Sequence, residues 1–265
     1  MKYSYVHCVC YWTGSNRIDN LSKHIQRVDE LKSAPNLVFL NIGCNNPENI
    51  NKDPYEKLCD IPTKNTEVYI HYTFNTGGTV RALYNVYTYL KAKNIEYDLL
   101  GTWEDDYMFK SEQTFVKAKE QLAKGHIFVG SSWYNPNSAY KDEYVVNERD
   151  GTGYHDFTTA DMELRKNAGL PKIKWCNIVR GGNSELTDKR TWIWTEDPYI
   201  TTKSNLDKIY AHLGEFTLAP IKELYDHDEH GINYGEVGFC IRLDRAGFTF
   251  IGLLHSRYFE YLNTS

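Results

Sequence analysis

Short apolar runs alternate with amphipathic stretches along the first half of the chain. The apolar runs are rich in β-branched and aromatic residues and have the length of buried strands; they cover residues 5–11, 37–42, 67–72, 97–102 and 126–130. The stretches between them repeat apolar residues at the spacing of one helix face; they cover residues 18–31, 80–90 and 115–122. Because strands and helices alternate, the pattern predicts a parallel sheet with right-handed helical crossovers over residues 1–130.

The second half of the chain has a less regular pattern. Residues 134–155 and 181–190 are polar and loop-like, whereas residues 235–246 have helical spacing and are followed by an apolar run to Leu254. No repeat, low-complexity tract or linker marks a boundary. We therefore expect one domain over residues 1–265, with residues 1–130 and 131–265 as two halves that share a sheet.

Composition limits the classes of partner and the compartment. The chain has 265 residues, 41% of them hydrophobic, which is enough for a full core, and a net charge of -5 that disfavours binding to nucleic acid. Its 6 cysteines are scattered, which favours reduced thiols in the cytoplasm. No apolar run has the length of a signal peptide core or a membrane span. A cytoplasmic protein is predicted, and this prediction leaves room for peripheral membrane contact.

Candidate chemistry begins where the fourth apolar run meets three consecutive carboxylates, Glu104, Asp105 and Asp106. Ligands bind at the carboxyl ends of strands in open α/β sheets. Adjacent carboxylates repel one another, and a divalent cation between them relieves that repulsion. Mg²⁺ and Mn²⁺ prefer such oxygen ligands and share them with substrate phosphates. The motif predicts a site for a metal-bound nucleotide, with one alternative: Asp105 or Asp106 caps a helix over residues 111–123.

A second motif, residues 72–82, follows the third predicted strand and enters a helix. Its paired glycines, Gly77 and Gly78, allow backbone amides to approach a ligand, and Arg81 in the first helical turn attracts phosphate. The alternative is an ordinary strand-to-helix turn with a surface arginine.

Two further candidates lie near the C-terminus. Glu236 begins the predicted helix of residues 235–246, where it is either a general base or an acid favoured by the helix dipole. His255 follows the last apolar run and could complete a metal site, or it is a surface or core histidine.

The acidic and histidine-containing stretch of residues 226–230 is interpreted as a solvated or acceptor-facing loop. Trp133, Tyr134, Trp192 and Trp194 are candidates for a substrate groove.

Taken in order, these motifs resemble those of GT-A fold glycosyltransferases, in particular the inverting family-2-like enzymes. Residues 75–82 are similar to that fold's Asn-x-Gly-x-x-Arg-Ala stretch, and residues 97–107 to its strand that ends in Asp-x-Asp. Residues 180–186 are similar to its glycine-rich stretch, and residues 235–248 to its Glu-Asp helix. Three positions depart from the family pattern: Glu104 replaces the first Asp, Gly235 replaces the acid before the base, and Asn41 replaces an Asp that contacts the nucleotide base.

The resemblance implies a GT-A fold, a Rossmann-like mixed and mainly parallel sheet flanked by helices, with residues 1–130 binding a nucleotide sugar and residues 131–265 binding an acceptor. It implies a role for each site residue: catalytic base Glu236; donor-binding Tyr11, Thr13, Asn41, Asn75, Gly78, Arg81, Trp103, Glu104 and Asp105; acceptor-binding Trp133, Gly181, Gly182 and Asn183; and Glu104, Asp106 and His255 as ligands of Mn²⁺ or Mg²⁺.

The expected function is metal-dependent transfer of a sugar from a nucleoside-diphosphate sugar to a hydroxyl of a glycan or another acceptor, with inversion. Three alternatives stay open. They are a retaining GT-A glycosyltransferase, a metal-dependent sugar nucleotidyltransferase that attacks the α-phosphorus, and a non-catalytic module that binds a glycan or a nucleotide.

Overall fold

The computed structural model describes residues 2–74, 78–132, 198–214, 239, 243 and 246–262. The described strands are β1 (Lys2–Trp12), β2 (Asn36–Cys44), β3 (Thr66–Phe74), β4 (Glu96–Glu104), β5 (Tyr107–Phe109), β6 (Phe128–Ser132), β7 (Tyr199–Thr201), β8 (Phe250–Leu254) and β9 (Phe259–Tyr261). The described helices are η1 (Thr13–Ser15), α1 (Ile18–Asp29), α2 (Asp53–Glu56), η2 (Lys57–Asp60), α3 (Gly78–Ala92), α4 (Gln113–Ala123), α6 (Lys203–Leu213) and α8 (His255–Tyr258).

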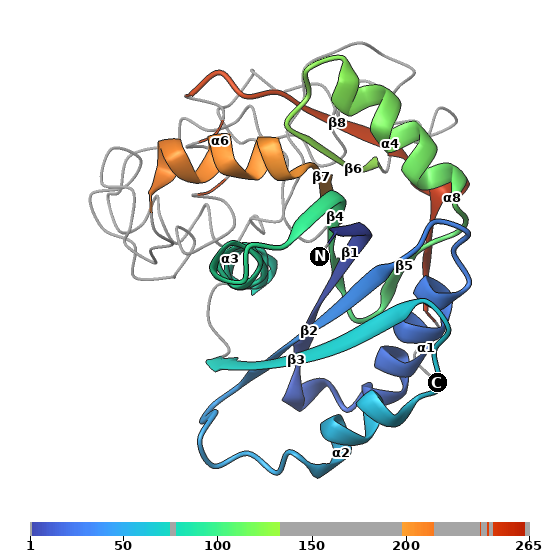
Figure 1. Cartoon of the computed structure of the whole chain (residues 1–265), viewed down its shortest axis with the longest axis vertical. Coiled ribbons are helices and arrows are strands. Elements are labelled where there is room, and N and C mark those ends of the chain that lie inside the picture. The colour runs from blue at the N-terminus through green and yellow to red at the C-terminus, as the bar shows by residue number, and fades with distance from the viewer. Residues whose placement is uncertain are drawn as a thin grey trace, which may run out of the picture.

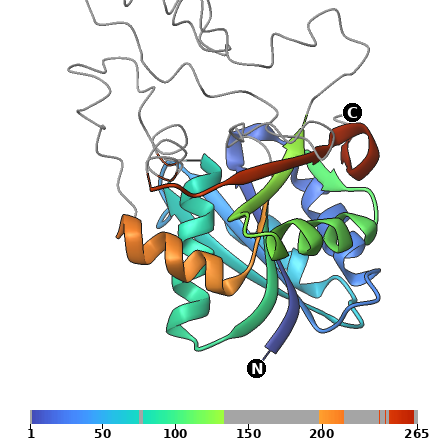
Figure 2. The ribbon, with the colours of Figure 1, turned by 90° about the horizontal axis from the view of Figure 1, so that it is seen from above.

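A seven-stranded sheet in the order β3-β2-β1-β4-β7-β6-β8 forms the centre of this described region. Strands β1 to β4 pair in parallel, β7 runs antiparallel to both β4 and β6, and β8 runs parallel to β6. Figure 2 shows β8 in red beside β6 in green. The predicted class, a mixed and mainly parallel Rossmann-like sheet flanked by helices, is confirmed.

The strand order creates a switch point between β1 and β4. From β1 the chain moves outward to β2 and β3, then crosses back to the other side of β1 as β4. The connections that leave the carboxyl ends of β1 and β4 therefore diverge, and such a divergence is where open α/β sheets bind ligands. The register places Cys10 of β1 beside Glu104 of β4, so β1 continues for two residues beyond the end of β4.

Helices cover both faces of the sheet and bury a hydrophobic cluster on each. Helices α1 and α4 pack one cluster around Leu21, Ile25 and Phe115, whereas α3 and α6 pack the other around Leu83 and Leu206. Figure 1 shows α3 and α6 on one side of the sheet and α1 and α4 on the other. From Tyr5 to Tyr11, the buried hydrophobic residues of β1 alternate between the two clusters, as the two-residue period of a strand requires.

The hydrophobic pattern located the regular elements of the first half. Each of the apolar runs overlaps one of the strands β1, β2, β3, β4 and β6, and the amphipathic stretches correspond to α1, α3 and α4. From the second half, β7 and β8 join the same sheet. The predicted loops at residues 134–155 and 181–190 lie outside the described residues. Within the described ranges, no helix combines the length and apolar character needed to cross a bilayer.

A close contact between β1 and β4 requires glycine at position 101. A Cβ atom added to Gly101 would lie 2.5 Å from the Tyr5 hydroxyl and 2.6 Å from Trp103 Nε1. Those two groups form a buried hydrogen bond, in which Trp103 Nε1 donates to Tyr5 at 2.7 Å. The absence of a side chain on Gly101 therefore leaves room for this bond.

We expect Gly101→Ala to lower the free energy of unfolding by about 1–3 kcal/mol, because the added methyl group overpacks the core. Chemical denaturation measures this loss. The Tyr5→Phe variant lacks the hydroxyl that the added methyl group meets. In this background, Gly101→Ala should lower the free energy of unfolding by less than it does in the wild type. Equal costs in the two backgrounds would show that the Tyr5 hydroxyl does not restrict this position.

Candidate functional site

Glu104, Asp105 and Asp106, here called the acidic tip, lie at the switch point between β1 and β4. Glu104 is the last residue of β4, and β5 begins at Tyr107. Helix α4 begins only at Gln113, with Glu112 at its N-cap position. The alternative that Asp105 or Asp106 caps this helix is therefore wrong, because a short strand separates them from it.

Arg17 forms ion pairs with two residues of the acidic tip. Its Nε lies 2.9 Å from Asp105 Oδ2, and its Nη2 donates to Asp105 Oδ1 at 3.0 Å. Its Nη1 donates to Asp106 Oδ2. Arg17 follows η1 at the end of β1 and immediately precedes α1, so these contacts join the ends of the two strands that flank the switch point.

The acidic tip is more buried than the cation that pairs with it. The exposed fractions are 6% for the Asp105 side chain, 22% for that of Asp106 and 31% for that of Arg17. Burial raises the pKa of Asp105 to about 6; Arg17 opposes this shift, and the charge of Asp106 adds to it. At pH 7 the Asp105 carboxyl is therefore mainly ionised but bears a desolvation cost that the guanidinium offsets.

Hydrogen bonds from distant segments also hold the backbone of the acidic tip. His24 Nε2 lies 3.1 Å from the Asp105 carbonyl oxygen. The Leu262 amide donates to the Asp106 carbonyl at 2.7 Å, next to the pairing of β5 with β9. Two successive carbonyl groups are thus fixed, one from α1 and one from the C-terminal segment.

The contact from His24 is the end of a buried hydrogen-bonded chain. Trp103 Nε1 donates to the Tyr5 hydroxyl at 2.7 Å, and this hydroxyl lies 2.9 Å from His7 Nδ1. His7 Nε2 lies 2.8 Å from His24 Nδ1. An indole N–H only donates and a backbone carbonyl only accepts, which sets the direction of the chain. All its bonds are satisfied when both imidazoles are neutral and carry their proton on Nε2.

The burial of the two imidazoles favours the same neutral forms. Burial lowers the pKa of His24 to about 4, partly opposed by the hydrogen bond with the Asp105 carbonyl. Burial, with a smaller contribution from His24, lowers the pKa of His7 well below its usual value. A proton added to either ring would leave a buried N–H without an acceptor and would break the chain.

One buried oxygen of the acidic tip lacks a hydrogen-bond partner. Asp106 Oδ1 is buried and has no hydrogen-bond partner among the described residues, whereas Oδ2 accepts from Arg17. An anionic oxygen of this kind suits Mg²⁺ or Mn²⁺, which take one or two carboxylates and complete their coordination with water and phosphate. In the described part of the chain, no group of three His, Cys, Asp or Glu side chains is close enough to hold a metal by itself. His255 begins α8, and its side chain lies outside the described atoms.

The other residues predicted to bind the donor differ in their access to solvent. Trp103 is 0% exposed, with its ring stacked on His7, so its indole packs in the core and is not available to a ligand. Asn41 is 2% exposed and accepts a 2.8 Å hydrogen bond from Asn85 Nδ2 of α3. Tyr11 is also 2% exposed and packs against Tyr55. Of this set, Thr13 in η1 is closest in sequence to Arg17 and is partly exposed.

The glycine-rich motif opens α3 as expected. Gly78, the first residue of α3, has a φ of 49°, a left-handed conformation that glycine adopts without strain. Arg81 follows in the first turn, and its charge adds to burial in lowering the pKa of His71 on β3. Asn75 lies outside the described residues, as do Glu236, the acceptor-binding set Trp133, Gly181, Gly182 and Asn183, and the groove candidates Tyr134, Trp192 and Trp194.

Two exposed aromatic rings at the same edge of the sheet were not predicted as site residues. Trp12 ends β1 and Phe74 ends β3, with exposed fractions of 50% and 54%. A Cβ atom on Gly14 would lie 2.5 Å from Trp12 Cζ2, so the indole covers this glycine. Exposed aromatic faces beside an anion site can stack on a base or a sugar. Their position just after the apolar runs of residues 5–11 and 67–72 was the signal in the sequence.

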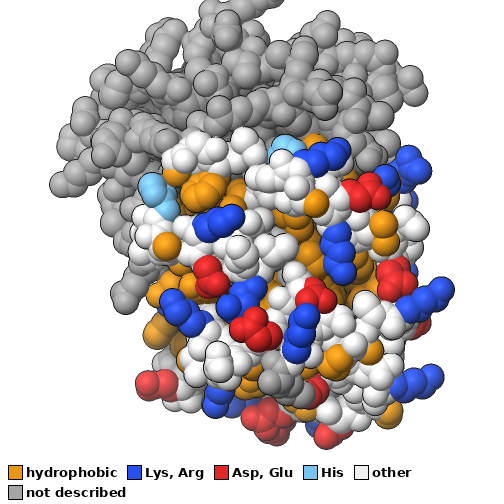
Figure 3. Space-filling view, turned by 45° about the horizontal axis from the view of Figure 1, so that its top comes forward, with side chains coloured by type: hydrophobic (Ala, Val, Ile, Leu, Met, Phe, Trp, Pro, Cys, Tyr) orange, Lys and Arg blue, Asp and Glu red, His pale blue; other side chains and the backbone are white. Residues whose placement is uncertain are grey.

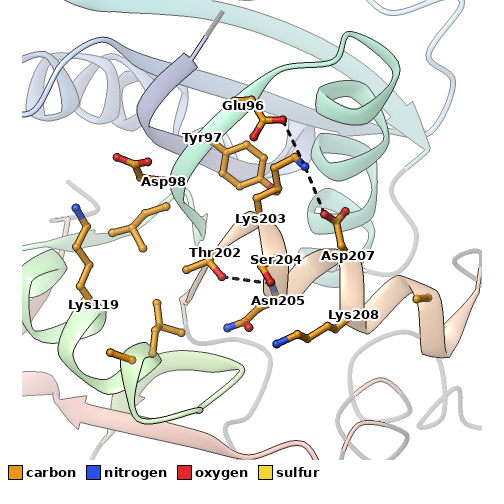
Figure 4. A pocket seen from close by; sticks show the side chains of 14 residues that line it. Glu96, Tyr97, Asp98, Lys119, Thr202, Lys203, Ser204, Asn205, Asp207 and Lys208 are labelled. Atoms are coloured by element: carbon orange, nitrogen blue, oxygen red, sulfur yellow. Dashed lines mark hydrogen bonds and ion pairs between the residues drawn. The ribbon is translucent and has the colours of Figure 1, made fainter.

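A groove of about 950 Å³ lies at the opposite end of β4. It is lined by Glu96 and Asp98 of β4, by Lys119 of α4 and by the first turns of α6. Figure 4 shows Lys203 between Glu96 and Asp207, at 3.5 and 3.4 Å. The charges that line this groove are mixed and partly paired with one another, and the groove is separated from the acidic tip by the length of β4.

The described surface has no dominant sign of charge on the face shown in Figure 3, where acidic and basic side chains are interspersed. This mixture agrees with the net charge of -5 and offers no extended cationic surface on that face.

Comparison with known proteins does not identify a family. No protein-family model matches the chain, and no curated protein matches it. A solved structure, the nucleoside-diphosphate-sugar pyrophosphorylase from Vibrio cholerae, is similar with a TM-score of 0.40 and 10% sequence identity, over 96% of this chain and 93% of that chain. Similarity at this level does not assign a function.

The buried histidines predict a loss of stability in mild acid. His24 has an ordinary pKa of 6.5 and a pKa of about 4 in the folded protein, so the unfolded chain binds more protons between these values. Within this window, the contribution of His24 makes the free energy of unfolding fall as the pH falls, by about 1.4 kcal/mol per pH unit. The ordinary pKa of Asp105 is 3.8, and burial raises it to about 6 in the folded protein. Between pH 3.8 and 6 the folded protein binds more protons at this carboxyl than the unfolded chain, so Asp105 makes the free energy of unfolding rise as the pH falls.

His24→Gln separates the contribution of His24 from that of Asp105. Glutamine can accept from His7 and donate to the Asp105 carbonyl, but it does not titrate. Urea unfolding between pH 4 and 7 should show a shallower loss of stability with acid in His24→Gln than in the wild type. His212→Gln, at an exposed position of α6, is the control and should keep the wild-type slope. An unchanged slope in His24→Gln would contradict the neutral, buried state of His24.

Proposed function

We propose that this protein is an enzyme that acts on a nucleoside-diphosphate sugar and transfers the sugar to a hydroxyl of a glycan or another acceptor. The observation that supports this proposal is the position of the acidic tip. Glu104 ends β4 at the switch point beside β1, and Asp105 and Asp106 follow it. His24 and Leu262 fix the backbone carbonyls of these two aspartates, and the buried Asp106 Oδ1 has no hydrogen-bond partner among the described residues. This arrangement suits a diphosphate that binds together with a divalent cation.

The proposed donor site combines the acidic tip with the start of α3. Asp106 and Glu104, with His255, would hold Mn²⁺ or Mg²⁺, which supplies positive charge that stabilises the departing diphosphate. Arg81 in the first turn of α3 adds a fixed positive charge. Thr13 and Gly78 would contact the same donor. Exclusion of water from this edge of the sheet would strengthen these interactions.

The proposed chemistry is a single displacement at the anomeric carbon. The acceptor oxygen forms a bond to this carbon as the bond to the diphosphate oxygen breaks, and the configuration inverts. Glu236 would accept the proton of the acceptor hydroxyl as general base. Trp133, Gly181, Gly182 and Asn183 would contact the acceptor.

The direct test is a search for turnover with the full chain. Purified protein is incubated with Mn²⁺ or Mg²⁺, a set of nucleoside-diphosphate sugars and a library of glycan acceptors, and products are identified by mass spectrometry. We expect release of a nucleoside diphosphate with a matched gain of one sugar on the acceptor, and NMR should show an inverted anomeric configuration. Pyrophosphate release from a nucleoside triphosphate and a sugar phosphate would establish nucleotidyl transfer instead. Saturable binding without any turnover would establish a binding module.

Two substitutions should separate chemistry from donor binding. Glu236→Gln should lower kcat about 10²- to 10⁴-fold, the usual contribution of a general base, with the Kd for the donor unchanged. Asp106→Asn should weaken metal-dependent donor binding itself, as measured by calorimetry. Asp60→Asn, at an exposed position in η2, is the matched control for a lost surface carboxylate. Undiminished transfer by Glu236→Gln would show that the assigned base is wrong.

A further inference from the structure

We propose that Arg17 binds the phosphate groups of the ligand, and that Asp105 and Asp106 hold its guanidinium in the orientation that this requires. The inference rests on the proposed function, because it assigns a phosphate-binding residue to the same site. No motif in the sequence predicts a role for Arg17. The acidic tip then has two functions: it offers Asp106 Oδ1 to a cation, and it orients an arginine toward the same ligand.

The hydrogen-bond capacity of Arg17 is only partly used. A guanidinium has five N–H donors. Asp105 accepts one N–H of Nη2 and lies 2.9 Å from Nε as an ion pair, without a hydrogen bond from Nε, and Asp106 accepts one N–H of Nη1. One N–H on each Nη nitrogen therefore has no partner among the described residues. Two such donors in one plane match two oxygens of a phosphate group.

The order of burial places the cation outside the acids. The side chain of Arg17 is 31% exposed, whereas those of Asp105 and Asp106 are 6% and 22% exposed. A ligand that approaches the switch point from solvent therefore meets the guanidinium before it meets the Asp105 carboxylate. Because Asp105 uses both oxygens on Arg17, we infer that it acts as a positioning residue and that Arg17 makes the ligand contact.

Arg27, within the helix α1 that Arg17 precedes, shows why the pairing of Arg17 differs from an ordinary surface ion pair. Arg27 lies 3.2 Å from Glu260 and 3.9 Å from Glu30, carboxylates that are 34% and 73% exposed. Ion pairs of such exposed groups are screened by water and have little preferred geometry. Arg17 instead pairs with a carboxylate that is almost fully buried, at the carboxyl end of β1, where the strands diverge. Arg27 is therefore a matched control on the same helix.

Inorganic pyrophosphate is the first probe, because its binding does not depend on the unidentified base or sugar. Calorimetry of the full chain compares pyrophosphate, a series of nucleoside diphosphates and the corresponding nucleosides, each with Mn²⁺ and with a chelator. In Arg17→Gln, we expect the affinity for pyrophosphate and for the preferred nucleoside diphosphate to fall about 10- to 100-fold, with the affinity for the nucleoside unchanged. The affinity of Arg17→Lys for pyrophosphate and for the nucleoside diphosphate should lie between those of the wild type and Arg17→Gln, because lysine keeps the charge but not the planar pair of donors.

Arg27→Gln should keep the wild-type affinities for all three kinds of probe. A ratio of diphosphate to nucleoside affinity that is the same in Arg17→Gln and the wild type would overturn the inference and leave Arg17 as a structural ion pair. If Arg17→Gln does not fold, side-chain NMR of wild-type protein labelled with ¹⁵N-arginine decides. Pyrophosphate should then shift an Nε resonance that is missing from Arg17→Lys, and an unshifted resonance would overturn the inference.

The outcomes distinguish this inference from the proposed function. Arg17-dependent diphosphate binding without sugar transfer would support the role of Arg17 and contradict the glycosyltransferase proposal. Sugar transfer together with donor binding that does not depend on Arg17 would support the glycosyltransferase proposal and contradict the role of Arg17. Failure of the wild-type protein to bind pyrophosphate or any nucleoside diphosphate would overturn both the role of Arg17 and a donor site at the acidic tip.

Discussion

The placement of three adjacent carboxylates at the end of a buried strand is the constraint on which the rest of the site depends. Their mutual repulsion and loss of hydration favour an extended, solvated loop. The fold opposes this tendency with Arg17 on the side chains and with His24 and Leu262 on successive backbone carbonyls. Groups from β1, α1 and the C-terminal segment thus converge on residues that follow β4. These contacts give the acidic tip a defined arrangement, and a preformed arrangement of this kind is what a binding site requires.

The hydrogen-bonded chain from Trp103 to the Asp105 carbonyl links the core to this site. Tyr5, His7 and His24 each accept one hydrogen bond and donate one, so the polar groups of the chain are satisfied inside an apolar cluster. Such a network specifies one arrangement of its members, because any displaced member leaves a buried polar group unpaired. The close approach at Gly101 belongs to the same network, since a side chain there would meet its first two members. The position of the acidic tip is therefore coupled to the packing of β1 against β4.

Sequence patterns predicted the strands β1 to β4 and β6, the helices α1, α3 and α4, and the edge of the sheet that carries the acidic tip, but they did not predict α2, β5, β7, α6 or β9. The first group of elements could be predicted because the hydrophobic periods of strands and helices are visible over ten or fewer residues. The partners of the acidic tip could not be found in this way. Arg17 is 89 positions from Asp106 in sequence, and His24 is 81 positions from Asp105. Their pairing follows from the parallel register of β1 and β4, which periodicity does not encode.

The structure differs from the sequence-based prediction at Trp103 and at the helix-cap candidates Asp105 and Asp106. The family resemblance placed Trp103 among the donor-binding residues, but alternation along β4 turns its side chain into the cluster beneath α1. Asp105 and Asp106 were plausible helix caps because α4 follows them, but β5 pairs with β9, a strand from the far end of the chain, and delays the helix. The position of Trp103 thus follows from the strand period, whereas a tertiary contact of β5 separates the two aspartates from α4.

The most direct test of the central claim is a crystal structure of the full chain with a bound nucleoside diphosphate and Mn²⁺. The account predicts the diphosphate at the carboxyl ends of β1 and β4, with its oxygens within hydrogen-bond distance of Arg17 and the anomalous signal of the metal beside Asp106 Oδ1. A diphosphate bound in the groove between α4 and α6, or at any place remote from the acidic tip, would contradict it.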